Sequence, residues 1–177
     1  IYAQSIQASF AGGTIVSSGL FNNNSAQARL LEIPKLTPEK SNNITLGVGF
    51  NPSKDLNLTF DFYNITIKDR IVYSSSITTK DDKTELYKIL TENDLASVQF
   101  FINGIKTRTS GLDFVASQRN LTLGRGNLGI NLAGNIVLDN EIVGSPNEPT
   151  AIKSAGSSIL NEQVKSLLTE GRPNYKV

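Results

Sequence analysis

Four residue types are absent from this sequence: cysteine, histidine, methionine and tryptophan. Without cysteine there are no disulfide bonds and no catalytic thiol. Without cysteine and histidine the usual ligands of a zinc site are missing, and so is the base of a Ser-His-Asp triad. We therefore expect no catalytic residue, no metal site and no bound cofactor, and we expect that the protein is not an enzyme.

An excess of charge of one sign is also lacking. The 17 basic and 16 acidic residues leave a net charge of +1, which provides no argument for a nucleic-acid partner. Nor is there an apolar run of about 20 residues, the length that a transmembrane helix requires. A role in a membrane would therefore require a β-barrel.

The first 40 residues carry little pattern, and we expect an irregular lead-in over 1–40. Gly12-Gly13 and Asn22-Asn23-Asn24 are typical of loops. Ser25 is a candidate N-cap for a short helix through Leu31, which Pro34 would end.

From Ser41 onward, apolar and polar residues alternate with a period of two, as in β-strands. The alternation predicts strands over about 42–51 and 55–73, joined by a compact turn. After Phe62 the apolar residues move to odd positions. Either a bulge exchanges the two faces there, or this half has left a bilayer and turns its apolar side inward. We favour the second explanation, because Lys68-Asp69-Arg70 would suit a solvated rim.

Two further strands are predicted over about 98–119 and 121–139, with a turn near 120–126 between them. Two long loops, 74–97 and 139–170, separate the strand pairs, and a further strand would start near 172. Each long loop contains apolar residues at helical spacing. These residues are Leu86, Ile89 and Leu90, after Asp81-Asp82 at a plausible helix start, and Leu160, Val164, Leu167 and Leu168, before Gly171 and Pro173.

Short and long connections thus alternate, as they do in outer-membrane barrels. The strands are also longer than those of a soluble sandwich. We therefore predict an all-β fold over 41–177: an antiparallel up-and-down meander of four to five long strands, a section of a transmembrane β-barrel, with short helices in the long loops. The residues predicted to face lipid are Ile44, Leu46, Val48, Phe50, Leu56, Leu58, Phe60, Phe62, Leu112, Phe114, Leu128, Ile130, Leu132 and Ile136.

Four segments, in order, resemble TonB-dependent receptors, particularly those of the Bacteroidetes type. The first, Leu36-Thr37-Pro38-Glu39-Lys40-Ser41, resembles a lead into a barrel strand, and the second, Tyr63–Ile71, resembles a strand end. The third, Phe100–Asp113, resembles the strand that follows, and the fourth, Glu170-Gly171-Arg172-Pro173, resembles the lead into the next. Each motif is modest alone, but four in the family's order and spacing are specific.

The resemblance implies an importer in the outer membrane of a Gram-negative bacterium. In this family a plug domain fills a barrel of about 22 strands, and the inner-membrane protein TonB acts on the plug. The implied partners are outer-membrane lipid, TonB through a plug domain outside this sequence, and a scarce ligand such as an iron chelate, cobalamin or a glycan. We expect this chain to be a section of the barrel that cannot transport alone, and the sequence indicates no individual ligand-binding residue.

Several motifs have simpler explanations than a site. Gly124–Gly129 matches G-x-G-x-x-G, but an alternating strand follows where dinucleotide binding needs a helix. Asn57-Leu58-Thr59 and Asn64-Ile65-Thr66 match a glycosylation pattern that alternation produces by chance. The acidic residues show no convergent pair of the kind that glycoside hydrolysis requires, although loop carboxylates leave a calcium site open. They are Asp61, Asp69, Asp81, Asp82 and Asp113.

Four aromatic residues lie near the ends of strands: Tyr63, Tyr73, Phe100 and Phe101. They are either an interfacial girdle or ligand contacts, and we favour the girdle or plain packing. The main alternative to the barrel is a soluble β-sandwich that acts as a binding or adhesion module, and the weakest is a jelly-roll hydrolase.

Overall fold

The fold was analysed in a computed structural model that describes residues 5–11, 13–171 and 173–177. The chain divides into two compact units. The first, which we call the core unit, comprises Ile1–Lys40, Lys68–Lys106 and Gly144–Leu167. The second, the sheet unit, comprises Ser41–Ile67, Thr107–Val143 and Leu168–Val177.

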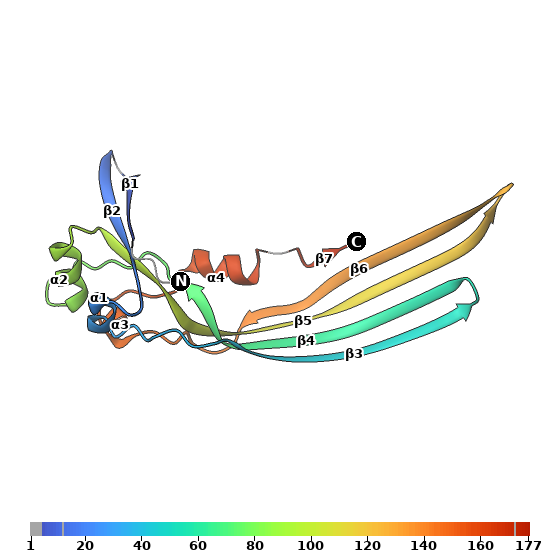
Figure 1. The fold of residues 1–177 in the computed structure, drawn as a ribbon, viewed down its shortest axis with the longest axis horizontal. Helices are drawn as coiled ribbons and strands as arrows, with labels where there is room; N and C mark the ends of the chain where they lie inside the picture. Colours follow the sequence, from blue (N-terminus) through green and yellow to red (C-terminus); the bar gives the residue numbers. More distant parts are fainter. Residues whose placement is uncertain (1–4, 12, 172) are drawn as a thin grey trace. The chain divides into compact units, whose positions relative to one another are not determined.

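Four long strands carry the sheet unit and are drawn side by side in Figure 1. They are β3 (Lys40–Ser53), β4 (Leu56–Tyr73), β5 (Ser97–Leu123) and β6 (Gly126–Ile142). Hydrogen bonding follows the order β3-β4-β5-β6, and β6 also pairs with the short β7 (Tyr175–Lys176). This arrangement confirms the predicted all-β, largely antiparallel meander.

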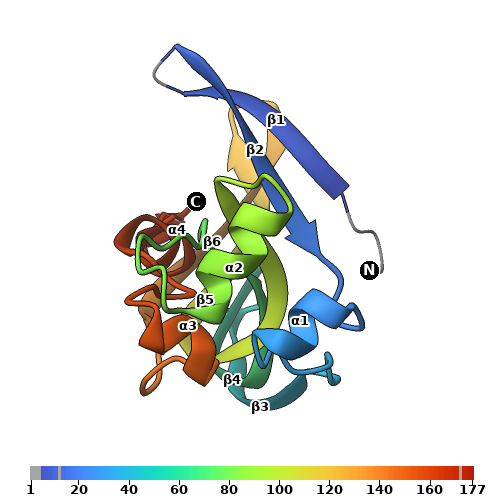
Figure 2. The ribbon, with the colours of Figure 1, turned by 90° about the vertical axis from the view of Figure 1, so that its left-hand side faces the viewer.

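The core unit contains the helices and a hairpin (Figure 2). The hairpin joins β1 (Ser5–Ala11) to β2 (Thr14–Phe21) in antiparallel register. The helices are α1 (Ala26–Leu30), α2 (Glu85–Glu92) and α3 (Thr150–Ser154), and α4 (Glu162–Thr169) begins in this unit and ends in the sheet unit. No helix in the described part of the chain is long and apolar enough to span a membrane.

The core unit is held by apolar residues brought together from its three segments. Phe100 and Ile102 of β5 are fully buried, as are Leu31 after α1 and Ile159 before α4. At Gly104 the packing is so close that an added Cβ would lie 2.7 Å from Ile159. Burial of side chains of this size is worth about 1.5–3 kcal/mol each, which makes this packing the main source of the unit's stability.

The prediction of an irregular lead-in over 1–40 was wrong, because this region contains the β1–β2 hairpin. The strands β1 and β2 are rich in serine and small residues, so their local pattern is weak. Their order depends on a distant contact, because Ser18–Phe21 pairs in parallel with Ser97–Phe100. Tertiary pairing therefore overrides local propensity here. Gly13 lies in the hairpin turn with φ 81°, whereas Gly12 lies outside the described residues.

The three predicted helices are present as α1, α2 and α4, with some shifts at their starts. The Ser25 side chain accepts a hydrogen bond from the Ala28 backbone N–H, which confirms Ser25 as the N-cap of α1. In α2 the predicted residues are buried, but the N-cap is Thr84 rather than Asp81-Asp82. Leu160 is buried just before α4 and is not part of it, and α3 was not predicted.

The boundary between the third and fourth strands also differs from the prediction. The turn lies at Gly124-Arg125, and residues 121–123 belong to β5 instead of to the next strand. The cause is a bulge: Asn120 has φ 51°, and the register shifts between Gln118 and Leu121 before pairing resumes. The next strand, predicted near 172, is seen as β7 at Tyr175; Arg172 itself lies outside the described residues.

Candidate functional site

The sheet unit has one apolar face. The register of β5 and β6 places Leu112 opposite Ile136 and Leu121 opposite Leu128 on this face, and Phe50 stacks on Phe60 at 6.3 Å. Most of the residues predicted to face lipid are exposed, from 75% for Leu46 to 37% for Phe62 and Leu112, and only Leu56, Leu58 and Phe114 are half-buried. Contact with lipid itself remains a prediction.

A charged cluster follows the apolar residues on this face. Leu138 is the extra residue of a bulge, so Asp139 and Glu141 come to the same side as Ile136. Arg108 lies across from them, with its guanidinium 2.5 Å from Glu141 and 3.6 Å from Asp139. Charged side chains cost little near the interfaces of a membrane barrel, so this cluster is compatible with the edge of a lipid-facing band.

The opposite face of the sheet unit is polar. Asp61 of β4 covers Gly47 of β3 so closely that an added Cβ would overlap its carboxylate. The Asn135 amide on β6 donates to Asp113 at 2.7 Å and to the hydroxyl of Tyr63 at 3.1 Å. Tyr63 therefore lies on the polar face together with Asp61. Side chains thus continue to alternate between the two faces at Phe62 and Tyr63, which disfavours the explanation that a bulge exchanges the faces at that point.

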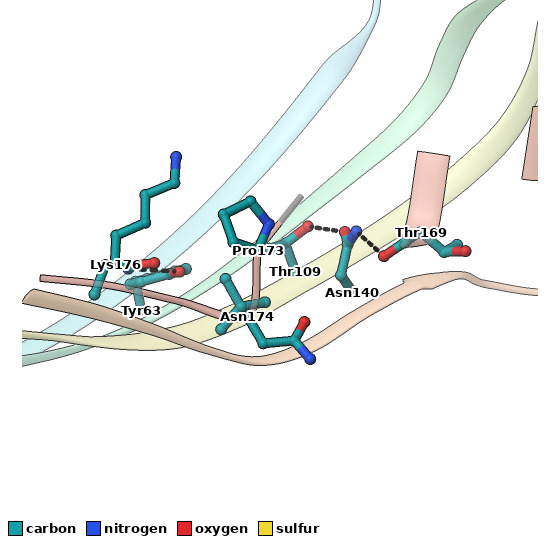
Figure 3. A pocket seen from close by; sticks show the side chains of 9 residues that line it. Tyr63, Thr109, Asn140, Thr169, Pro173, Asn174 and Lys176 are labelled. Carbon is teal, nitrogen blue, oxygen red and sulfur yellow. Dashed lines mark hydrogen bonds between the residues drawn. The ribbon is translucent and has the colours of Figure 1, made fainter. Parts of the chain in front are cut away.

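A hollow of about 130 Å³, which we call the polar pocket, opens on this face (Figure 3). Strands β4, β5, β6 and β7, the last residue of α4 and the segment between α4 and β7 contribute its walls, so the pocket lies wholly within the sheet unit. Its lining residues are Tyr63, Thr109, Asn135, Val137, Asn140, Thr169, Pro173, Asn174 and Lys176.

Hydrogen bonds hold the end of α4 and the segment after it in place beside the pocket. The Asn140 amide donates to the backbone carbonyls of Leu168 at 3.1 Å and Thr169 at 2.8 Å. Its side-chain oxygen accepts from the Thr109 hydroxyl at 2.9 Å (Figure 3). The Val137 N–H donates to the Asn174 carbonyl at 2.7 Å. These contacts fix the end of α4 and the segment around Asn174 against β6, so that this wall of the pocket is well defined.

No pattern in the sequence predicted the polar pocket. Of its residues, Tyr63 was singled out as an aromatic near a strand end, and Thr109 and Pro173 appeared only within segments that resemble the family. Thr109, Asn135 and Asn140 fall on polar positions of alternating strands, which is a weak signal because many residues share it. The contacts with Thr169 and Asn174 cross a long loop, and no sequence pattern indicates them.

The other aromatic candidates are separated by the structure. Phe100 is fully buried in the core unit. Tyr73 and Phe101 form a tilted ring pair at 5.1 Å, and the Tyr73 hydroxyl donates to Gln99 at 3.0 Å. Phe100 therefore packs in the core, and the other two form a partly exposed pair.

The acidic candidates do not converge. Asp61 and Asp113 lie on the polar face, and Asp69 adopts φ 54° within β4. Asp81 bonds to the backbone N–H of Lys83, two residues along the chain. Within the described ranges there is no group of three or more histidine, cysteine or acidic residues that could hold a metal ion.

The glycine-rich motif at Gly124–Gly129 forms a turn and the start of a strand. Gly124 has φ 63° in a hairpin turn, and a strand follows it where a dinucleotide site would need a helix.

Comparison with known proteins gives one match. The family described as TonB dependent receptor-like, beta-barrel, matches residues 2–157. No curated protein and no solved structure matched the chain. The family match covers most of the sequence and agrees with the long antiparallel strands and the two-faced sheet. This chain therefore belongs to the family of TonB-dependent receptor β-barrels, the outer-membrane receptors that take part in transport.

Proposed function

We propose that this chain is a section of the outer-membrane barrel of a receptor, of the Bacteroidetes type, that imports a scarce ligand with energy from TonB. The observation that carries the proposal is the sheet unit, whose strands expose aliphatic and aromatic side chains on one face and polar ones on the other. At 14–27 residues these strands exceed the roughly 9–11 needed to cross a bilayer. The family match supports the same reading.

The partners follow from this arrangement. The apolar face would contact outer-membrane lipid, and the polar face would line the interior of the barrel. TonB would act through a plug domain elsewhere in the receptor, and the imported ligand would be an iron chelate, cobalamin or a glycan. In the proposed barrel the section has no catalytic role.

A section of barrel would not transport alone. Among the described strands β3 pairs only with β4, and β6 meets β7 over two residue pairs, so the sheet is not closed. An unclosed sheet leaves unpaired backbone groups at its edges. We propose that further strands of the same receptor pair with these edges, in a Gram-negative outer membrane.

The test is to isolate the natural polypeptide that carries this sequence and to measure its location and its intact mass. We expect it in the outer-membrane fraction with a mass several-fold above 19.2 kDa. We also expect uptake of its ligand to stop when TonB is deleted. A water-soluble polypeptide close to 19.2 kDa would contradict the proposal and favour a β-sandwich binding module.

A further inference from the structure

The polar pocket offers a ligand a particular set of hydrogen-bonding groups. Both N–H groups of Asn135 are already used, one on Asp113 and one on Tyr63, so Asn135 can present only its carbonyl oxygen. The Tyr63 hydroxyl accepts one of these bonds, so its own hydrogen can be donated elsewhere. An acceptor and a donor therefore lie next to each other at one side of the pocket.

The second side of the pocket offers an acceptor. Asn140 uses its N–H groups on the carbonyls of Leu168 and Thr169. The Thr109 hydroxyl donates to Asn140, which leaves the lone pairs of its oxygen able to accept. One donor, from Tyr63, and two acceptors, from Asn135 and Thr109, are therefore fixed by their own partners. They suit a ligand whose groups both donate and accept, as hydroxyl groups do.

The pocket offers a multiply charged anionic ligand only one opposite charge among the described residues. Lys176 is the only charged residue among the described residues that line it, and Asp113 lies directly behind Asn135. A multiply charged chelate would be desolvated here with little compensation. The volume of about 130 Å³ is also below the range of about 300–1,000 Å³ that drug-sized ligands occupy. The pocket therefore fits one small neutral unit of a larger molecule.

Tyr63 is held in position by a close contact with the backbone. A Cβ at Gly111 would lie 2.2 Å from the Tyr63 hydroxyl oxygen. Glycine at this position therefore lets the ring lie against β5 and directs the hydroxyl to Asn135. The donor is fixed before a ligand arrives, which lowers the entropic cost of binding.

From these observations we infer that the polar pocket is a binding subsite for one unit of a neutral, hydroxyl-rich ligand, which is the chemistry of a carbohydrate. The inference rests on the proposed function, because it names the ligand class that the receptor would import. Tyr63 and Asn135 would bind one pair of sugar hydroxyls, and Thr109 would accept from another. Val137 and Pro173 would contact the C–H groups of the ring.

The test uses the whole receptor purified in detergent, with titration calorimetry against defined probes. Maltohexaose, cellohexaose and mannohexaose are the neutral probes, and a ferric tris-catecholate and a ferric hydroxamate are the chelate probes. We expect at least one neutral probe to bind. The substitutions Tyr63→Phe and Thr109→Val should each weaken that binding by about 2- to 10-fold, since each removes one hydrogen bond to the ligand together with the internal bond to Asn135 or Asn140.

Two further variants separate a ligand contact from a folding defect. Gly111→Ala keeps every polar group, but its Cβ would lie 2.2 Å from the Tyr63 hydroxyl oxygen and 2.6 Å from the Ile136 carbonyl oxygen, so a Gly111→Ala receptor that still folds should bind more weakly, as Tyr63→Phe does. Tyr175→Phe removes the same atom from a tyrosine that is 73% exposed and outside the pocket, so it should leave binding unchanged. The heat-modifiable gel shift of each purified variant would report whether its barrel has folded.

The outcomes are distinct. The inference is overturned if no neutral probe binds, or if folded Tyr63→Phe and Thr109→Val receptors bind like the wild type. TonB-dependent uptake of a ferric chelate by an outer-membrane receptor that ignores all three oligosaccharides would sink the carbohydrate inference and leave the proposed function intact. A polypeptide found outside the outer membrane would contradict both the carbohydrate inference and the proposed function.

Discussion

The core unit and the sheet unit differ in how far their apolar side chains are exposed. Every fully or nearly buried apolar residue of the described chain lies in the core unit, with Phe100, Ile77 and Leu86 at 0% exposure. In the sheet unit comparable side chains are exposed, such as Ile44 at 60% and Ile130 at 48%. Because large exposed apolar surfaces are rare on proteins in water, we expect an apolar surrounding for the sheet unit and not for the core unit.

The connections of the chain explain how one sequence contains both units. β4 and β5 each contribute residues to both units, and the segments that complete the core come from the long connections and the N-terminal part. The core unit needs contacts between distant segments, whereas the sheet unit needs only neighbouring strands. The difference can be tested with paired substitutions, one in each unit.

The largest effect is expected for Phe100→Ala in the core unit. Phe100 is fully buried, and such truncations cost about 3–5 kcal/mol. Phe60→Ala in the sheet unit removes a side chain that is 46% exposed, so it should leave the core unit unaffected. Hydrogen exchange of the whole receptor in detergent would show faster exchange around α2 only for Phe100→Ala. Equal loss of protection around α2 in both variants would contradict the proposed difference between the two units.

The next effect concerns charge on the apolar face. Ile130→Lys should destabilise the inserted barrel by about 2–4 kcal/mol if the residue lies at bilayer depth, and Leu58→Lys should behave alike. Asn131→Lys is the matched control, because the adjacent residue points to the polar face. Folding into lipid vesicles, followed by the gel shift of the folded barrel, would measure the difference. Indistinguishable assembly of Ile130→Lys and Asn131→Lys would refute the lipid-facing assignment.

A smaller effect is expected at the N-cap of α1. Ser25→Ala removes the side-chain bond to the Ala28 N–H and should cost about 1 kcal/mol. Ser25→Asp keeps an accepting oxygen and should retain most of the stability. Limited proteolysis between α1 and β3 would compare the two variants. If Asp and Ala were equally sensitive to the protease, the capping bond would not be the cause.

The smallest effect is expected for the ion pairs of the sheet unit. The Arg108 side chain is 46% exposed, and pairs of this kind contribute about 0.2–1 kcal/mol. Arg108→Gln should therefore lower the free energy of unfolding slightly, and the loss should shrink as salt screens the charges. Arg125→Gln, in the β5–β6 turn, controls for the loss of a positive charge. A large, salt-independent loss at Arg108 would indicate a packing role.

The sequence by itself determined the features that depend on near neighbours. The alternation of apolar and polar residues predicted the strands and the two faces, and the order of short and long connections predicted the meander. The cap at Ser25 and the helix around Leu86–Leu90 were also predicted, because helical spacing and capping involve residues within one or two turns.

Only the tertiary structure decided the features that depend on distant partners. The β1–β2 hairpin pairs with β5, some 79 residues further along the chain for Ser18 and Ser97. The polar pocket joins Tyr63 of β4 to Asn135 of β6, 72 residues apart. The bulge at Asn120 likewise appears only in the pairing register. A local pattern records which face a residue prefers, whereas the partner that it meets there depends on how the whole chain folds.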